Sequence, residues 1–115
     1  MTSYRKQRLA HAMKEEISHL LLKDIKDPRI GMVTITKVRL SEDLKRARIY
    51  FTNFLNAVTD KNAALAGLNR SAGFIQRVLG KRLNLRYIPY ITFFYDDSFE
   101  YEAKIEELIE EAKKK

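Results

Sequence analysis

The stretch KNAALAGLNRSAGFIQRVLGKRLNLR, residues 61–86, decides the fold of this chain. Its apolar residues recur at spacings of three and four, a pattern typical of helices that bury one face. They are Leu65, Leu68, Ala72, Ile75, Val78, Leu79 and Leu83. Three small residues, Ser71, Ala72 and Gly73, lie in the middle of the pattern, and a glycine inside a helix costs about 1 kcal/mol relative to alanine. We therefore predict two helices that meet at a bend there, with Ser71 capping the second helix.

Basic residues follow the same stretch on one side of the predicted helices. Together with the glycine of the bend they recur at spacings of three and four, at Arg70, Gly73, Arg77 and Lys81. A helix that begins at a bend points free N–H groups outward, which suits a phosphate group. A bent helical pair with a merely solvated basic rim explains this segment equally well on its own.

The charge of the whole chain favours a phosphate-binding role for these cations over a merely solvated rim. The 115 residues, enough for one domain with a modest core, carry a net charge of +7. This value combines +11 over residues 1–95 with −4 over residues 96–115, and no Asp or Glu occurs between Asp60 and Asp96. A surface of one sign usually faces a polyanion, and nucleic acid is the commonest one. An anionic membrane is the rival partner, but the basic helices lack a Trp- or Phe-rich insertion face.

Composition also argues against several other functions. There are no cysteines, so disulfides, Cys-ligated zinc and thiol catalysis are excluded. No apolar run approaches the ~20 residues that span a bilayer, and the first residues do not form a secretory leader, so we expect a cytoplasmic protein. A nuclease needs clustered carboxylates or a histidine pair, and His11 and His19 are poorly spaced for this. We predict no enzyme activity, no metal site and no cofactor.

The rest of the chain predicts an α+β fold. A helix over 3–24 precedes strands at 32–40 and 45–55, the helical pair, a strand at 87–95 and a helix from residue 98. We expect this α-β-β-α-kink-α-β order, plus the C-terminal helix, to form a three-stranded sheet with helices on one face. The apolar phase of the first strand changes between Ile35 and Val38, which predicts a bulge. Residues 1–97 would form the domain, and residues 98–115 an acidic helix that packs on its body.

The second strand carries an additional pattern. Ala47, Ile49 and Phe51 alternate toward the core, whereas Arg46, Arg48 and Tyr50 alternate toward the opposite face. Arginines interleaved with aromatic residues are typical of a base-stacking surface. The solvated outer face of any small α+β domain reads the same way.

This order of elements resembles a type II KH domain. Ordinary KH domains join their paired helices by a Gly-x-x-Gly loop that clamps a nucleic-acid backbone. Here Ser71-Ala72-Gly73 replaces that loop, which is similar to the Ala-x-Gly kink of the ribosome-binding factor A family, with Ser71 where the family usually has alanine. Further matching segments are Asp27-Pro28-Arg29, VTITKVRLSEDLKRARIYF (33–51) and SAGFIQRVLGKRLNLRYIPYITFFYDDS (71–98).

The resemblance implies a non-catalytic, cofactor-free and monomeric factor that binds the immature small ribosomal subunit and its precursor 16S-type rRNA. Such a factor assists late maturation and 5′-end processing of that RNA, matters most in the cold and is released with an assembly GTPase. A general single-stranded RNA-binding KH-like module is the alternative, and a protein-docking role of the last helix through Tyr101, Ile105 and Ile109 is another. The RNA-binding residues that we predict are Arg5, Lys6, Arg8, Arg70, Ser71, Ala72, Gly73, Arg77, Lys81, Arg82 and Arg86.

Overall fold

In the residues that it describes, a computed structural model has three helices and three strands in the order α-β-β-α-β-α. It describes residues 4–25, 30, 33–53 and 60–113, with the side chains of 99–103 left undescribed. The elements are α1 (Tyr4–Lys23), β1 (Thr34–Leu40), β2 (Arg46–Thr52), α2 (Lys61–Arg82), β3 (Tyr90–Tyr95) and α3 (Ser98–Lys113). The segment Asp27-Pro28-Arg29, the start of the first predicted strand and the end of the second lie outside the described residues, as does the side chain of Tyr101.

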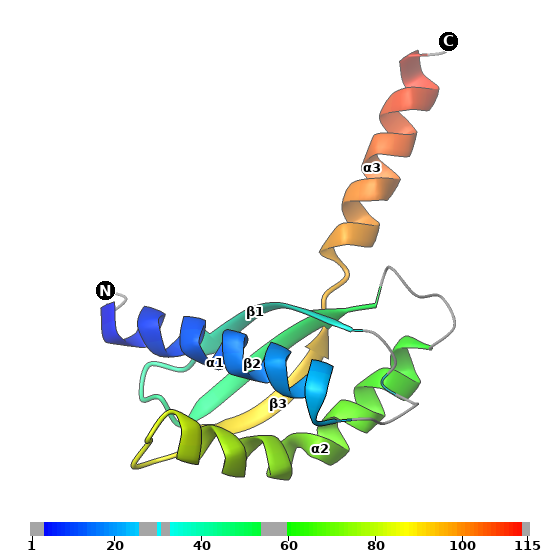
Figure 1. Cartoon of the computed structure of the whole chain (residues 1–115). Helices are drawn as coiled ribbons and strands as arrows, with labels where there is room; N and C mark the ends of the chain where they lie inside the picture. The colour runs from blue at the N-terminus through cyan, green and yellow to red at the C-terminus, as the bar shows by residue number, and fades with distance from the viewer. Residues whose placement is uncertain (1–3, 26–29, 31–32, 54–59, 114–115) are drawn as a thin grey trace.

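The sheet has the strand order β1-β2-β3, with β1 antiparallel and β3 parallel to β2. A tight turn joins β1 to β2, whereas α2 forms the crossover to β3, as a parallel connection requires. The register between β1 and β2 shifts between Ile35 and Lys37, which confirms the predicted bulge. In Figure 1, α1 and α2 lie on one side of the sheet, and the predicted α+β architecture is confirmed.

The core lies between the sheet and these two helices. Ala47, Ile49 and Phe51 of β2 are all buried, as their alternation along the strand predicts. They meet apolar residues at helical spacing from α1 and α2 and the inward residues of β1 and β3. The other core residues are Met13, Ile17, Leu20, Ile30, Ile35, Leu40, Ala64, Leu68, Ile75, Leu79, Ile91 and Phe93.

The prediction of two separate helices in residues 61–82 is wrong, because α2 is one continuous 22-residue α-helix. Asp60 caps it by accepting the N–H of Asn62 at 3.0 Å, and Ser71 lies in the helix interior instead of capping a second helix. A penalty of about 1 kcal/mol at Gly73 is small compared with the hydrogen bonds and buried face that a break would forfeit. Figure 1 nevertheless shows that the axis of α2 changes direction near its middle.

The expected packing of the last helix on the body is also wrong. Figure 1 shows α3 projecting away from the sheet, and its residues 104–113 are all exposed. Its apolar residues Ile105, Leu108 and Ile109 are 38%, 57% and 49% exposed. Only Asp96 and Asp97 separate β3 from α3. The short link lets α3 continue past the end of the sheet, whose inner face α1 and α2 already cover.

Candidate nucleic-acid interface

The outer face of α2, defined here by Arg70, Gly73, Arg77 and Lys81, carries three of the predicted RNA-binding cations. All four residues are exposed. Spacings of three and four place them on one side of the helix, opposite the buried Leu68, Ile75 and Leu79. The sequence prediction that these cations share a face is therefore confirmed for the described helix. The predicted contacts at Ser71 and Ala72 are less accessible, because both residues are half-buried.

Gly73 leaves an open place between Arg70 and Arg77. A Cβ built at Gly73 meets only one described atom within 4 Å, the Nη1 of Arg77 at 4.0 Å, so packing does not require a glycine there. Gly80 differs, because its Cβ would lie 2.6 Å from the Cδ1 atom of Ile88. Gly80 thus lies against the side chain of Ile88, whereas Gly73 exposes bare backbone on the outer face of α2.

Two side-chain amides fix the rotation of α2 about its axis. The Oε1 atom of Gln76 accepts the N–H of Ile91, and the Oδ1 atom of Asn69 accepts the N–H of Phe93, both at 3.1 Å. These N–H groups point outward from β3, an edge strand, and would otherwise be unpaired. Asn69 and Gln76 are not among the residues predicted from the sequence. Their seven-residue spacing beside the apolar face is the signal that would have identified them.

Arg82 does not share the outer face of α2. Its guanidinium group lies 3.2 Å from the carboxylate of Glu16 and 3.5 Å from that of Asp24, both on the α1 side. Arg82 thus ties the two helices together. Its side chain is 39% exposed, so these are surface ion pairs of modest energy.

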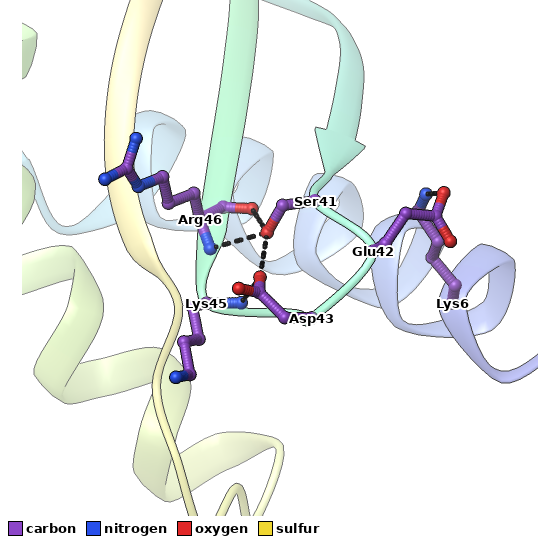
Figure 2. Close-up of polar contacts among 6 residues, drawn as sticks. All are labelled: Lys6, Ser41, Glu42, Asp43, Lys45 and Arg46. Atoms are coloured by element: carbon purple, nitrogen blue, oxygen red, sulfur yellow. Dashed lines mark hydrogen bonds and ion pairs between the residues drawn. The ribbon is translucent and has the colours of Figure 1, made fainter.

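The three predicted cations at the start of α1 also divide into one that pairs with a carboxylate and two that are exposed to solvent. Lys6 pairs with Glu42 at 2.7 Å and links α1 to the β1–β2 turn, as Figure 2 shows. Arg5 and Arg8 are exposed, and the Cζ atom of Arg8 lies 5.6 Å from the centre of the Tyr4 ring. Arg5 and Arg8 thus remain candidates for a ligand, whereas Lys6 has a structural partner.

The β1–β2 turn is organised by one carboxylate. Asp43 accepts the hydroxyl of Ser41 at 2.7 Å and the N–H of Lys45 at 3.0 Å, and both bonds lower the pKa of Asp43. The Ser41 hydroxyl in turn accepts the N–H of Arg46 at 3.0 Å. Figure 2 shows that the side chains of Lys45 and Arg46 extend away from this network, so their charges remain available at the surface.

A groove of about 980 Å³ lies where the start of α1, this turn and the loop after α2 meet. Its cations are Arg5, Lys45 and Arg86, and the Cζ atom of Arg86 lies 5.6 Å from the centre of the Tyr87 ring. Tyr87 is 78% exposed. Arg86 therefore belongs to this groove, next to the C-terminal end of α2, and adjoins the outer face of α2 instead of lying on it.

Within the described ranges, no group of three or more metal-ligating side chains comes together. None of the helices described here is both long and apolar enough to cross a membrane. The arrangement defines a small basic α+β protein whose exposed helix face is lined by cations, a class typical of nucleic-acid binding.

Comparison with known proteins identifies the family. Residues 5–109 match the family model of ribosome-binding factor A, and the chain belongs to this family. It is 46% identical over 112 residues to ribosome-binding factor A of Syntrophobacter fumaroxidans, covering 96% of this chain and 95% of that protein. The crystal structure of ribosome-binding factor A from Thermus thermophilus superimposes with a TM-score of 0.67 at 26% identity, covering 78% of this chain and 94% of that chain.

A second Thermus thermophilus coordinate set is a homology model of ribosome-binding factor A fitted into the cryo-EM map of a 30S complex. It superimposes with a TM-score of 0.60 at 26% identity and covers 84% of this chain and 97% of that chain. The family and the fold are thus established together.

Proposed function

We propose that this protein binds the immature small ribosomal subunit through its RNA, using the outer face of α2. Arg5, Arg8 and Arg86, at the adjoining end of the molecule, would extend the contact. The observation that carries the proposal is the position of Gly73, whose bare backbone lies between the exposed cations Arg70 and Arg77. The fitting of a Thermus thermophilus relative into a 30S complex supports the same partner.

The geometry of the outer face suits a folded RNA better than a small anion. Arg70 and Lys81 lie about 16 Å apart along the helix at a rise of about 1.5 Å per residue, so they reach separate phosphate groups. Phosphate contacts set the position of a protein on RNA, and a rigid array of cations selects RNA whose phosphates match it. The helix N-terminus proposed at Ser71 plays no part in this account, because α2 does not begin there.

The finer role that we propose is assistance to late maturation of the precursor RNA, including processing at its 5′ end. Low temperature stabilises wrong RNA pairings, so a protein that binds one conformer shifts the population by its differential affinity. This role requires binding energy alone, without catalysis or a cofactor, and release from the subunit would be coupled to an assembly GTPase. On this account the protein would matter most in the cold.

Co-sedimentation of the purified protein with small subunits tests this function. Immature subunits from cold-grown cells should retain the protein more strongly than mature subunits, and naked duplex RNA of similar charge should retain it least. Equal retention by all three would contradict the proposed selectivity and leave only general attraction to polyanions.

A further inference from the structure

The open face of the sheet, on the side opposite α1 and α2, carries a second set of cations together with aromatic rings. The strand register places its outward residues in three rows, one behind another along the strands. The rows are Lys37, Tyr50 and Phe94, then Arg39, Arg48 and Thr92, and then Arg46 and Tyr90. None of these eight side chains is a carboxylate.

The aromatic rings on this face, Tyr50, Phe94 and Tyr90, are called the platform here. Tyr50 and Phe94 stack with 5.7 Å between ring centres and 28° between their planes. Phe94 is 40% exposed, and Tyr90 in the last row is 66% exposed. Exposed rings on the face of a sheet can stack with planar groups, and every nucleic-acid base is planar.

Cations surround this platform closely. The Nζ atom of Lys37 lies 4.7 Å from the centre of the Tyr50 ring, and the Cζ atom of Arg48 lies 5.9 Å from that of Phe94. A strand of nucleic acid lying on the rings would therefore bring its phosphates next to positive charge, as single-strand binding surfaces require.

One pairing on this face opposes folding. Arg39 and Arg48 lie directly opposite each other on β1 and β2, and like charges in this position destabilise a sheet. In the part of the chain that the structure describes, no carboxylate forms an ion pair with the guanidinium group of Arg39, Arg46 or Arg48. A bound polyanion would relieve this repulsion, which is independent support for a ligand on this face.

We propose that the open face of the sheet binds an unpaired segment of RNA, with bases stacked on Phe94 and Tyr90 and phosphates held by Arg39, Arg46 and Arg48. A duplex does not fit, because its bases are already stacked on one another and its edges face the grooves. The inference rests on the proposed function, since the immature subunit would supply the strand. It adds a surface on the other side of the molecule from the outer face of α2.

A tryptophan reporter tests the site, because the chain contains no tryptophan. Phe94→Trp places the reporter on the open face, and Leu22→Trp, near the C-terminal end of α1 and outside both proposed RNA-binding faces, is the control at a residue 76% exposed. Titration with an oligouridylate of about eight nucleotides should quench Phe94→Trp saturably and leave Leu22→Trp nearly unchanged. If Phe94→Trp fails to fold by circular dichroism, Tyr90→Trp replaces it.

Two further measurements decide between stacking and charge alone. Adding Arg48→Gln to the reporter should weaken oligouridylate binding about tenfold. An abasic phosphodiester of the same length should bind the reporter protein at least tenfold more weakly than oligouridylate does. Equal binding of the abasic strand, or a reporter that oligouridylate does not quench, would overturn the proposal; the second result is also expected if the acidic α3 or a protein covers this face.

A variant of α2 tests the proposed function independently of the open face. Arg77→Gln with Lys81→Gln changes only the outer face of α2, so this variant should lose affinity for immature subunits while the Phe94→Trp reporter still responds to oligouridylate. A reporter that stays silent while subunits still bind through α2 would refute the open-face site alone. Unchanged subunit binding by the α2 variant would refute the proposed function alone.

Discussion

The Oδ1 atom of Asn69 accepts the N–H of Phe93 at 3.1 Å, which ties the middle of α2 to the free edge of β3. Gln76 makes the same contact with Ile91, seven residues further along the helix. Arg70 and Arg77 each follow one of these amides in the chain, so each is turned about 100° away from the sheet and toward solvent. The amides that bind the sheet therefore orient the cations that we assign to RNA.

Replacing Asn69 by alanine should lower the free energy of unfolding by about 1 kcal/mol, because the N–H of Phe93 loses its partner. Asn62→Ala is the matched control, since it makes the same change at an exposed position of the same helix. Urea unfolding of both variants measures the difference. Equal midpoints would show that the contact adds no stability.

Gly73→Ala should stabilise the free protein by up to about 1 kcal/mol, because alanine favours the helix and its Cβ has room. The same change should weaken binding to immature subunits if RNA approaches the bare backbone. Gly80→Ala should gain less than Gly73→Ala, because its Cβ would lie 2.6 Å from the Cδ1 atom of Ile88, and this side chain would have to move. Thermal unfolding together with subunit co-sedimentation checks both variants. A Gly73→Ala protein that binds with undiminished affinity would remove Gly73 from the interface.

Arg82→Gln should affect stability more than RNA binding, because the side chain pairs with Glu16 and Asp24. Exposed ion pairs contribute little, so the expected loss in the free energy of unfolding is below about 1 kcal/mol. Arg77→Gln, on the outer face of α2, should instead reduce RNA binding more than stability. Subunit affinities measured for both variants at one salt concentration separate the two roles, and a larger loss of affinity for Arg82→Gln would reverse our assignment.

Asp96 should make the protein sensitive to acid. The Ser98 hydroxyl, at 2.6 Å, and the Thr36 hydroxyl, also at 2.6 Å, stabilise its charged form and lower the pKa of its carboxyl. A carboxyl whose folded pKa lies below its unfolded value of about 3.9 stabilises the fold above that value. This stability is lost as pH falls from about 4 through the lowered folded pKa.

Unfolding free energies measured between neutral pH and about pH 3 test this sign. Asp96→Asn should be less stable than the parent at neutral pH and should lose less on acidification. Asp97→Asn removes the neighbouring exposed carboxylate and serves as the control for net charge. An unchanged acid response in Asp96→Asn would assign the acid sensitivity to other groups.

Much of the fold follows from the sequence, because burial imposes a period on the chain. The alternation of Ala47, Ile49 and Phe51 predicts the inner face of β2, and the altered phase after Ile35 predicts the bulge. The cations on the outer face of α2 follow from helical spacing in the same way. Each of these features depends on neighbours within a few residues, so a local pattern suffices.

The features that the sequence did not reveal depend on distant partners or on small energy differences. Arg82 meets Glu16 across 66 positions and Lys6 meets Glu42 across 36, and no local pattern marks such pairs. The continuity of α2 depended on whether a single glycine outweighs the packing on both sides of it. The position of α3 depended on whether its apolar stripe has a surface of the domain to pack against. The inner face of the sheet is already covered by α1 and α2.

The most direct test of the central claim is the salt dependence of binding to immature small subunits when the outer face of α2 is neutralised. The variant Arg70→Gln, Arg77→Gln and Lys81→Gln is compared with a control of equal charge change, Lys23→Gln, Lys104→Gln and Lys113→Gln, at exposed residues outside this face. We predict that the first variant loses affinity and that the steepness of its log K against log salt falls by about 0.7–0.9 per lost phosphate contact. The control should keep most of its affinity and most of its salt dependence. Equal affinities and slopes for the two variants would contradict the assignment of RNA binding to α2.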